Sequence, residues 1–79
     1  MIVHIYSLRK PVYEQESRSV NLKTISGEIT ILDDHRPLIA PLATGNIRVI
    51  DTQGKEEVVE SKSGFVEVRP GGEVNILLK

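Results

Sequence analysis

The chain has 79 residues, enough for one small domain with a limited hydrophobic core. Its formal net charge of −1 does not suit a nucleic-acid binder held by phosphate contacts, and the absence of cysteine excludes a disulfide framework and thiolate chemistry. No apolar run is long enough to span a membrane, and no signal-peptide pattern precedes the first expected strand.

The first third of the chain predicts strands. Val, Ile and Thr are frequent, and no window places apolar residues at helical spacing. The first expected strand covers residues 2–8, and a short segment with Val12 and Tyr13 follows the interruption at Pro11. Residues 17–22 form another expected strand, whose apolar side chains share one face because side chains alternate along a strand.

The most distinctive stretch of the sequence covers residues 26–42. It begins with the turn signal Ser26-Gly27 and continues into an apolar alternation. A polar corner follows at residues 33–36, which read Asp-Asp-His-Arg, and Pro37 ends it. Two acids, a histidine and an arginine in succession are costly to bury, so we expect this corner to face water or a partner.

The second half of the chain predicts further short strands separated by turn signals. The expected strands cover residues 46–50, 56–59 and 65–69, with a last alternating strand at residues 74–78. Strands of this length at this spacing are typical of a β-sandwich or barrel. We therefore expect one all-β domain over residues 1–79. The expected core residues are Ile29, Ile31, Ile47, Val49, Phe65 or Val66, and Ile76.

The sequence offers no set of residues typical of catalysis or of cofactor binding. The serines at positions 26, 61 and 63 have no base and orienting acid in a known motif, and neighbouring Asp33 and Asp34 would point to opposite faces of a strand. Gly71-Gly72 is too short for a phosphate-binding loop. We therefore expect no catalytic residue and no cofactor.

The two histidines do not predict a metal site. His4 and His35 are far apart in the sequence, and neither has a close cluster of further ligands, whereas zinc needs three or four. For His4, the simpler interpretation is a strand residue on the wetter face.

The central stretch resembles a known family. Its residues Gly27-Glu28-x-x-Ile31-Leu32-x-x-His35-x-Pro37-Leu38 are similar to the signature Gly-Glu-x-Gly-Ile-Leu-Pro-Gly-His-x-Pro-Leu of the F-type ATP synthase epsilon subunit. Four further segments match the family in order. They are the opening strand with Ser7, Val20-x-Leu22, Gly45-x-Ile47-x-Val49, and Gly64-Phe65-Val66-Glu67-Val68 with the final strand.

The resemblance also has departures. Asp33 stands in place of the family's proline, and Thr30 and Asp34 in place of two of its glycines. Three more usual glycine positions hold Gln15, Thr24 and Ser63. Because glycine often serves a tight backbone conformation, we expect some of these loops to differ in shape.

The resemblance implies a fold and a role. The fold is a small ten-stranded β-sandwich of two antiparallel sheets, as in the family's N-terminal domain. The role is that of a non-catalytic subunit of the central stalk, which links the gamma subunit to the polar loops of the c-ring and couples ion translocation and rotation to ATP synthesis. It would be peripheral to the membrane, on the cytoplasmic face of a bacterial plasma membrane or the organellar equivalent.

The resemblance further implies contact residues. It assigns Glu28 and His35 to the ring-facing end and Ser7 to a contact with gamma. The family's C-terminal helical pair is absent from these residues, so we expect a subunit that stabilises the rotor without inhibiting ATP hydrolysis and without binding ATP. The alternative, which the glycine losses leave open, is a free-standing β-sandwich that binds another protein or a small ligand.

Overall fold

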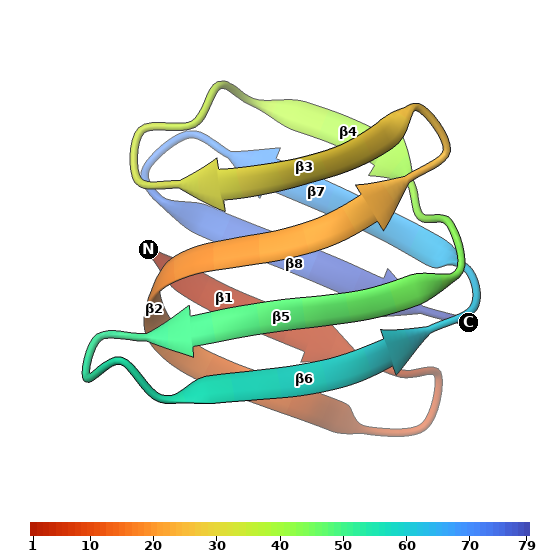
Figure 1. Cartoon of the computed structure of the whole chain (residues 1–79), viewed down its shortest axis with the longest axis horizontal. Coiled ribbons are helices and arrows are strands. Elements are labelled where there is room, and N and C mark those ends of the chain that lie inside the picture. The colour runs from red at the N-terminus through yellow and green to blue at the C-terminus, as the bar shows by residue number, and fades with distance from the viewer.

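The computed structural model describes all residues from Met1 to Lys79 and is built from strands and turns alone. Figure 1 shows the eight strands in two layers. The strands are β1 (Ile2–Tyr6), β2 (Pro11–Thr24), β3 (Gly27–Leu32), β4 (Leu38–Pro41), β5 (Gly45–Asp51), β6 (Glu56–Ser61), β7 (Gly64–Arg69) and β8 (Glu73–Leu78). The structure contains no helix long and apolar enough to cross a membrane.

The strand order is β4-β7-β8-β1-β2-β5-β6, with β3 paired to β2 beside this path. The first half of β2 pairs with β1, and its second half pairs with both β3 and β5. The long β2 therefore belongs to both layers: β4, β7, β8 and β1 complete one sheet, and β3, β5 and β6 complete the other. The register of β2 shifts between Ser17 and Ser19, where the strand passes from one layer to the other.

The expected all-β sandwich is confirmed, but its expected details were wrong in two respects. The structure has eight strands and not ten, and the segment around Tyr13 and the strand at residues 17–22 form one continuous strand. The sheets are also not purely antiparallel, since β1 pairs with β8 in parallel. The two strands come from opposite ends of the chain, and no short-range turn signal encodes that pairing.

The core lies between the two sheets and consists of aliphatic side chains that alternate with outward-facing ones along most strands. The expected core residues Ile31, Ile47, Val49 and Ile76 are buried, and Ile29 is half-buried. Between the two alternatives left open, Val66 is fully buried and Phe65 is 43% exposed.

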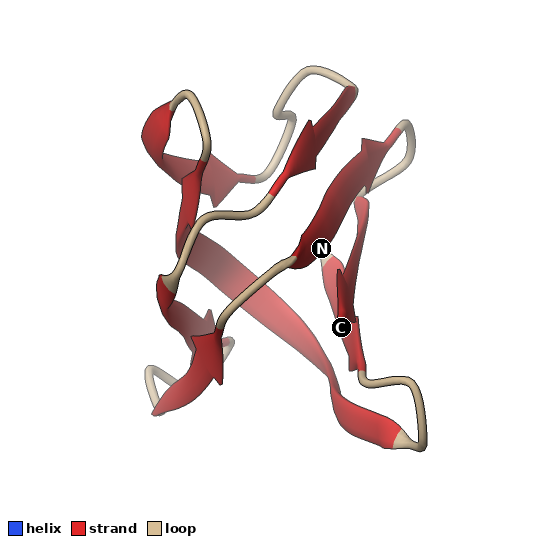
Figure 2. Ribbon diagram, turned by 90° about the vertical axis from the view of Figure 1, so that its right-hand side faces the viewer, coloured by secondary structure: helices blue, strands red, loops and turns tan.

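The strand termini place the loops at two ends of the molecule (Figure 1). One end carries the C-terminus and the connections β1–β2, β2–β3, β4–β5 and β6–β7. Figure 2 looks onto this end. The opposite end carries the N-terminus and the connections β3–β4, β5–β6 and β7–β8.

Candidate functional site

The polar corner forms a β-turn between β3 and β4. The His35 amide donates to the Leu32 carbonyl at 3.2 Å, which closes the turn, and Asp34 has a φ of 67°. A positive φ at the third residue alone is typical of a type II turn, which favours Pro-Gly at its two central positions. The epsilon-type signature has Pro-Gly here, whereas this chain has Asp33 and Asp34. At Asp34, therefore, the backbone keeps a conformation that glycine favours.

We expect Asp34→Val to lower the free energy of unfolding by about 1–2 kcal/mol, because a β-branched residue is strained at positive φ. Asp34→Gly should leave it within about 0.5 kcal/mol of the parent or raise it, since glycine relieves strain but frees the unfolded chain. Urea denaturation of the three proteins measures both changes. An Asp34→Val protein as stable as the parent would contradict the strained turn.

Asp33 holds the start of the chain. The Met1 amino group lies 3.0 Å from the Asp33 Oδ1 atom and 3.2 Å from the Glu16 Oε2 atom, and it donates to the Ser17 carbonyl at 3.2 Å. The hydrogen bond that this amine donates to Asp33 raises its pKa above the ordinary value of 8.0, against an opposing effect of burial. The turn, β2 and the first residue of the chain are thus joined by charge-assisted hydrogen bonds.

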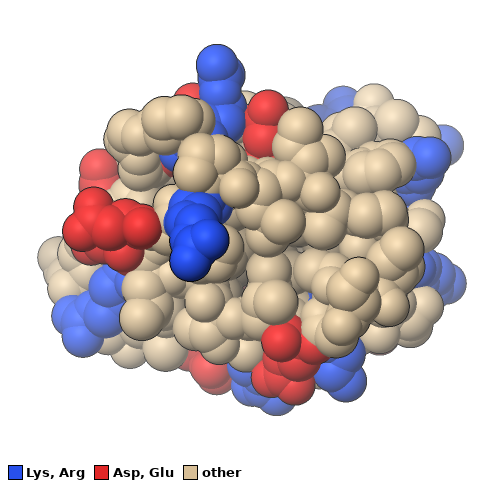
Figure 3. All heavy atoms as spheres, turned by 90° about the horizontal axis from the view of Figure 1, so that it is seen from above, with Lys and Arg blue, Asp and Glu red and all other residues tan.

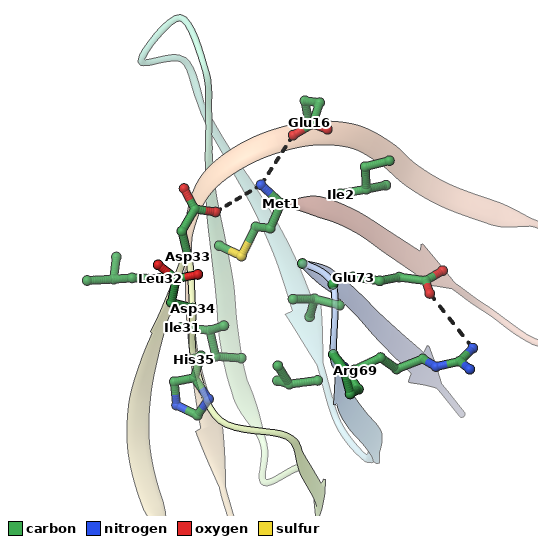
Figure 4. Close-up of a pocket in the computed structure, with 15 residues that line it drawn as sticks. Met1, Ile2, Glu16, Ile31, Leu32, Asp33, Asp34, His35, Arg69 and Glu73 are labelled. Atoms are coloured by element: carbon green, nitrogen blue, oxygen red, sulfur yellow. Dashed lines mark hydrogen bonds and ion pairs between the residues drawn. The ribbon is translucent and has the colours of Figure 1, made fainter.

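These groups surround an open hollow of about 720 Å³ between the ends of the two sheets. Figure 4 shows Asp33, Asp34 and His35 on the β3 side and Arg69 and Glu73 on the facing β7–β8 side. An ion pair of 3.7 Å joins Arg69 to Glu73. The rim of the hollow is polar. Asp33, Asp34 and Arg36 are exposed, which is consistent with the expectation that this corner faces water or a partner.

Glu28 lies on β3 and not in a turn. It is the second residue of that strand and faces Lys23 in the β2–β3 ladder. The Asn21 Nδ2 atom donates to Glu28 Oε2 at 3.0 Å and is 2.9 Å from the Thr30 Oγ1 atom. The carboxylate is exposed, and the hydrogen bond from Asn21 on the neighbouring strand orients it.

The structure does not bring Glu28 and His35 together. They lie at opposite ends of β3, and the four residue steps from Glu28 to Leu32 alone span about 13 Å at the usual strand rise. Between them Thr30 and Leu32 are also exposed. The two residues belong to one exposed edge of the sandwich, along β3, and do not form a single corner. His35 is half-buried, and its Nδ1 atom lies 2.8 Å from the Arg36 carbonyl oxygen.

Ser7 is used within its own loop. Its hydroxyl donates to the Lys10 carbonyl at 3.1 Å and accepts from the amides of Arg9 and Lys10, each at 3.3 Å. The side chain therefore closes the β1–β2 hairpin. A contact with another subunit at this position would involve the neighbouring exposed residues at least as much as Ser7 itself.

The other histidine, His4, makes contacts within the fold. His4 lies on β1 between two acids, with Nδ1 2.7 Å from Glu14 Oε2 and Nε2 3.6 Å from Glu73 Oε2. No group of three or more His, Cys, Asp or Glu side chains is arranged to hold a metal ion. His4 thus joins three adjacent strands on the outer face of its sheet.

Sequence reasoning missed Asn21 and the ion pair of Asp33. The contact of Asn21 could have been predicted from the sequence, because a two-residue turn at Ile25-Ser26 sets a register that places Asn21 opposite Thr30 and near Glu28. The ion pair of Asp33 could not have been predicted, since it depends on the position of the N-terminus beside a loop far along the chain.

Comparison with known proteins adds a family and a set of relatives. The family described as ATP synthase, Delta/Epsilon chain, beta-sandwich domain matches residues 1–79. The chain is 52% identical over 59 residues to the ATP synthase epsilon chain of Shouchella clausii, covering 75% of this chain and 44% of that protein. It is 40% identical over 68 residues to the ATP synthase epsilon chain of Bacillus subtilis, covering 86% of this chain and 51% of that protein.

Solved structures agree with the family match. A chain of the Euglena gracilis mitochondrial ATP synthase, in a structure that includes the c-ring, has a TM-score of 0.92 and 25% identity, over 99% of this chain and 49% of that chain. A chain of the Tetrahymena thermophila mitochondrial ATP synthase central stalk and c-ring has a TM-score of 0.80 and 14% identity, over 99% of this chain and 62% of that chain, and shows the fold alone. The chain spans about half the length of the curated relatives that it matches.

Proposed function

The chain belongs to the ATP synthase Delta/Epsilon chain β-sandwich family, and from this membership we propose that it acts as an epsilon-type subunit in the central stalk of a membrane ATP synthase. Its role is mechanical and not catalytic: it links the gamma subunit to the polar loops of the c-ring, so that ion translocation and rotation stay coupled to ATP synthesis. The observation that carries the proposal is the family match over the whole chain.

We infer that the exposed β3 edge carries the ring contact. Glu28, held by Asn21, offers an oriented carboxylate, and His35 offers an imidazole beyond the far end of the same strand. A carboxylate is complementary to basic and polar loop groups, and such complementarity sets orientation and association rate. The gamma contact is assigned to the β1–β2 hairpin that Ser7 closes. The complex lies at the cytoplasmic face of a bacterial plasma membrane or its organellar equivalent.

We expect Glu28→Arg to weaken attachment of the stalk to the ring, because it replaces attraction with repulsion. A charge pair at an interface rim contributes about 1 kcal/mol or less, and a partly desolvated one several. Glu28→Gln is the matched variant, since it removes the charge but keeps an oxygen to accept from Asn21. The loss should therefore rank Glu28→Arg above Glu28→Gln, and the difference should shrink as salt rises.

The measurement is proton-driven ATP synthesis in vesicles that hold the reconstituted complex. Urea denaturation of each variant chain shows whether folding has changed, either through loss of the Asn21 contact or through repulsion between the introduced guanidinium and Lys23. A Glu28→Arg complex that couples as well as the parent, with normal folding, would remove Glu28 from the contact. Failure of the parent chain to copurify with gamma would favour the free-standing binding module. His35→Ala should act in the same direction with a smaller effect.

A further inference from the structure

Glu28 has two neighbours on β2 that can reach its carboxylate. Lys23 lies directly opposite Glu28 in the β2–β3 ladder, and Asn21 lies two residues earlier on the same face. Residues that are directly opposite each other have Cβ atoms about 5 Å apart, so the register favours an ion pair between Glu28 and Lys23. The structure contains no such ion pair. The side chain that holds the carboxylate is Asn21.

Asn21 is itself fixed by acceptors on β3. Its Nδ2 atom lies 3.0 Å from Glu28 Oε2, 2.9 Å from Thr30 Oγ1 and 3.4 Å from the Ile29 carbonyl oxygen. The hydroxyl of Thr30 stands where the epsilon-type signature has a glycine, which offers no side-chain acceptor. Asn21 is half-buried, and all three acceptors draw its amide toward β3. A neutral group therefore orients the Glu28 carboxylate without cancelling its charge.

The side chain of Lys23 lies in the other direction, toward β5. A Cβ atom built on Gly45, the first residue of β5, would be 2.9 Å from the Cδ atom of Lys23, 3.5 Å from its Cγ and 3.6 Å from its Cε. The methylene chain of Lys23 thus occupies the space that a side chain at position 45 would need. Because β2 pairs with β3 on one side and with β5 on the other, Lys23 leans away from the strand that carries Glu28.

Acidic and basic side chains lie close together on this part of the surface. Figure 3 looks down on the side of the sandwich formed by β3 and β4, and it shows Asp and Glu atoms near Lys and Arg atoms. A carboxylate that is paired with a neighbouring ammonium has less net charge to offer a partner. The direction in which Lys23 lies therefore affects how strongly Glu28 can attract a partner.

We propose that Asn21 and Gly45 are positioning residues for the contact of Glu28 with the polar loops of the ring. Asn21 orients the carboxylate, and Gly45 leaves the room in which Lys23 lies away from it. This role, which rests on the ring contact proposed for Glu28, has a consequence that a purely structural role lacks. Both residues act through the charge of Glu28, so both should lose their effect on the ring contact when that charge is removed.

A first experiment tests the geometry in the chain without any partner. A water-soluble carbodiimide joins an ammonium and a carboxylate that are in contact, and mass spectrometry of the digested chain locates the link. We expect the link between Lys23 and Glu28 to be about two- to fivefold more abundant in the Asn21→Ala and Gly45→Ala chains than in the parent. Thermal melts show that the compared chains are folded. An equal yield of this link in the parent and both variants would overturn the arrangement.

A second experiment measures the contact in the complex. The chain is titrated into vesicles that hold a synthase depleted of its epsilon-type subunit, and the concentration that restores half of the proton-driven ATP synthesis is determined. We expect this concentration to rise about fivefold for Glu28→Gln and about two- to threefold for Asn21→Ala and for Gly45→Ala. In the Glu28→Gln background, neither substitution should raise it further. In a Lys23→Gln background, Gly45→Ala should have no effect, since the competing ammonium is gone.

Asn75→Ala is the matched control, because the Asn75 Nδ2 atom donates to Glu67 Oε1 at 3.3 Å on the outer face of the other sheet. Its effect should be the same in the parent and in the Glu28→Gln background. If Asn21→Ala also had equal effects in both backgrounds, the positioning role would be overturned and Asn21 would only stabilise the hairpin. If Glu28→Gln restored synthesis as well as the parent, the ring contact itself would be wrong. The carbodiimide links would still show whether Lys23 is held aside, so the two failures are distinguishable.

Discussion

Gly64→Ala is expected to lower the free energy of unfolding by about 3–5 kcal/mol, the range of severe core or backbone defects. Gly64 begins β7 with a φ of 148°, and a Cβ atom built there would lie 2.0 Å from the carbonyl oxygen of Leu77. The obstructing atom belongs to the backbone of β8, which cannot rotate away as a side chain can. The β7–β8 ladder would therefore have to separate at this end.

A matched glycine isolates the effect of this close approach. Gly54 also has a positive φ, of 87°, but no atom lies within 4 Å of the position of its Cβ. Gly54→Ala should therefore cost only the conformational strain, about 1–2 kcal/mol. Urea denaturation of both variants and the parent gives the comparison. If Gly64→Ala cost no more than Gly54→Ala, the contact with Leu77 would not constrain the strand.

Ile5→Ala should cost about 3–4 kcal/mol, because it removes a fully buried side chain from the middle of the core. Ile5 lies on β1, opposite Tyr13 of β2 and Ile76 of β8, so a cavity there would weaken the contact of three strands with the facing sheet. A domain of this size has a stability of about 4–12 kcal/mol, so the loss would be a large share of the total.

Graded substitutions test whether the burial of Ile5 is the cause of this loss of stability. Ile5→Val should cost about 0.5–1.5 kcal/mol, and Ile39→Ala, at a side chain that is 72% exposed, should change stability by less than about 0.5 kcal/mol. Urea denaturation of these variants measures the series. Equal losses at Ile5 and Ile39 would show that the core is not organised around β1.

The alternation of apolar and polar residues was enough to predict the strands and most of the core. It could not decide between Phe65 and Val66, because both are apolar neighbours. In the structure, Gly64 approaches the backbone of β8 closely, and this approach fixes which side chains of β7 point inward. Val66 is therefore the buried one of the two. The same local pattern could not show that β2 is one strand, since the polar run Glu14-Gln15-Glu16 and the register shift between Ser17 and Ser19 interrupt its apolar alternation.

The candidate site was predicted less completely than the fold. The resemblance identified Glu28 and His35, but their separation along β3 follows from the strand that connects them. The ordering of Glu28 by Asn21 depends on the hairpin register, and the role of Asp33 depends on the distant N-terminus.

The parallel pairing of β1 with β8 has a consequence for folding during synthesis on the ribosome. β1 is synthesised before the other seven strands, and the register from Val3–Val74 to Ile5–Ile76 can form only after β8 has emerged. Until then one edge of β1 stays open, and hairpins β2–β3 and β5–β6 can assemble without it. Closure of the sandwich is therefore a late event with a large loop to close, which predicts slow folding for a domain of this size.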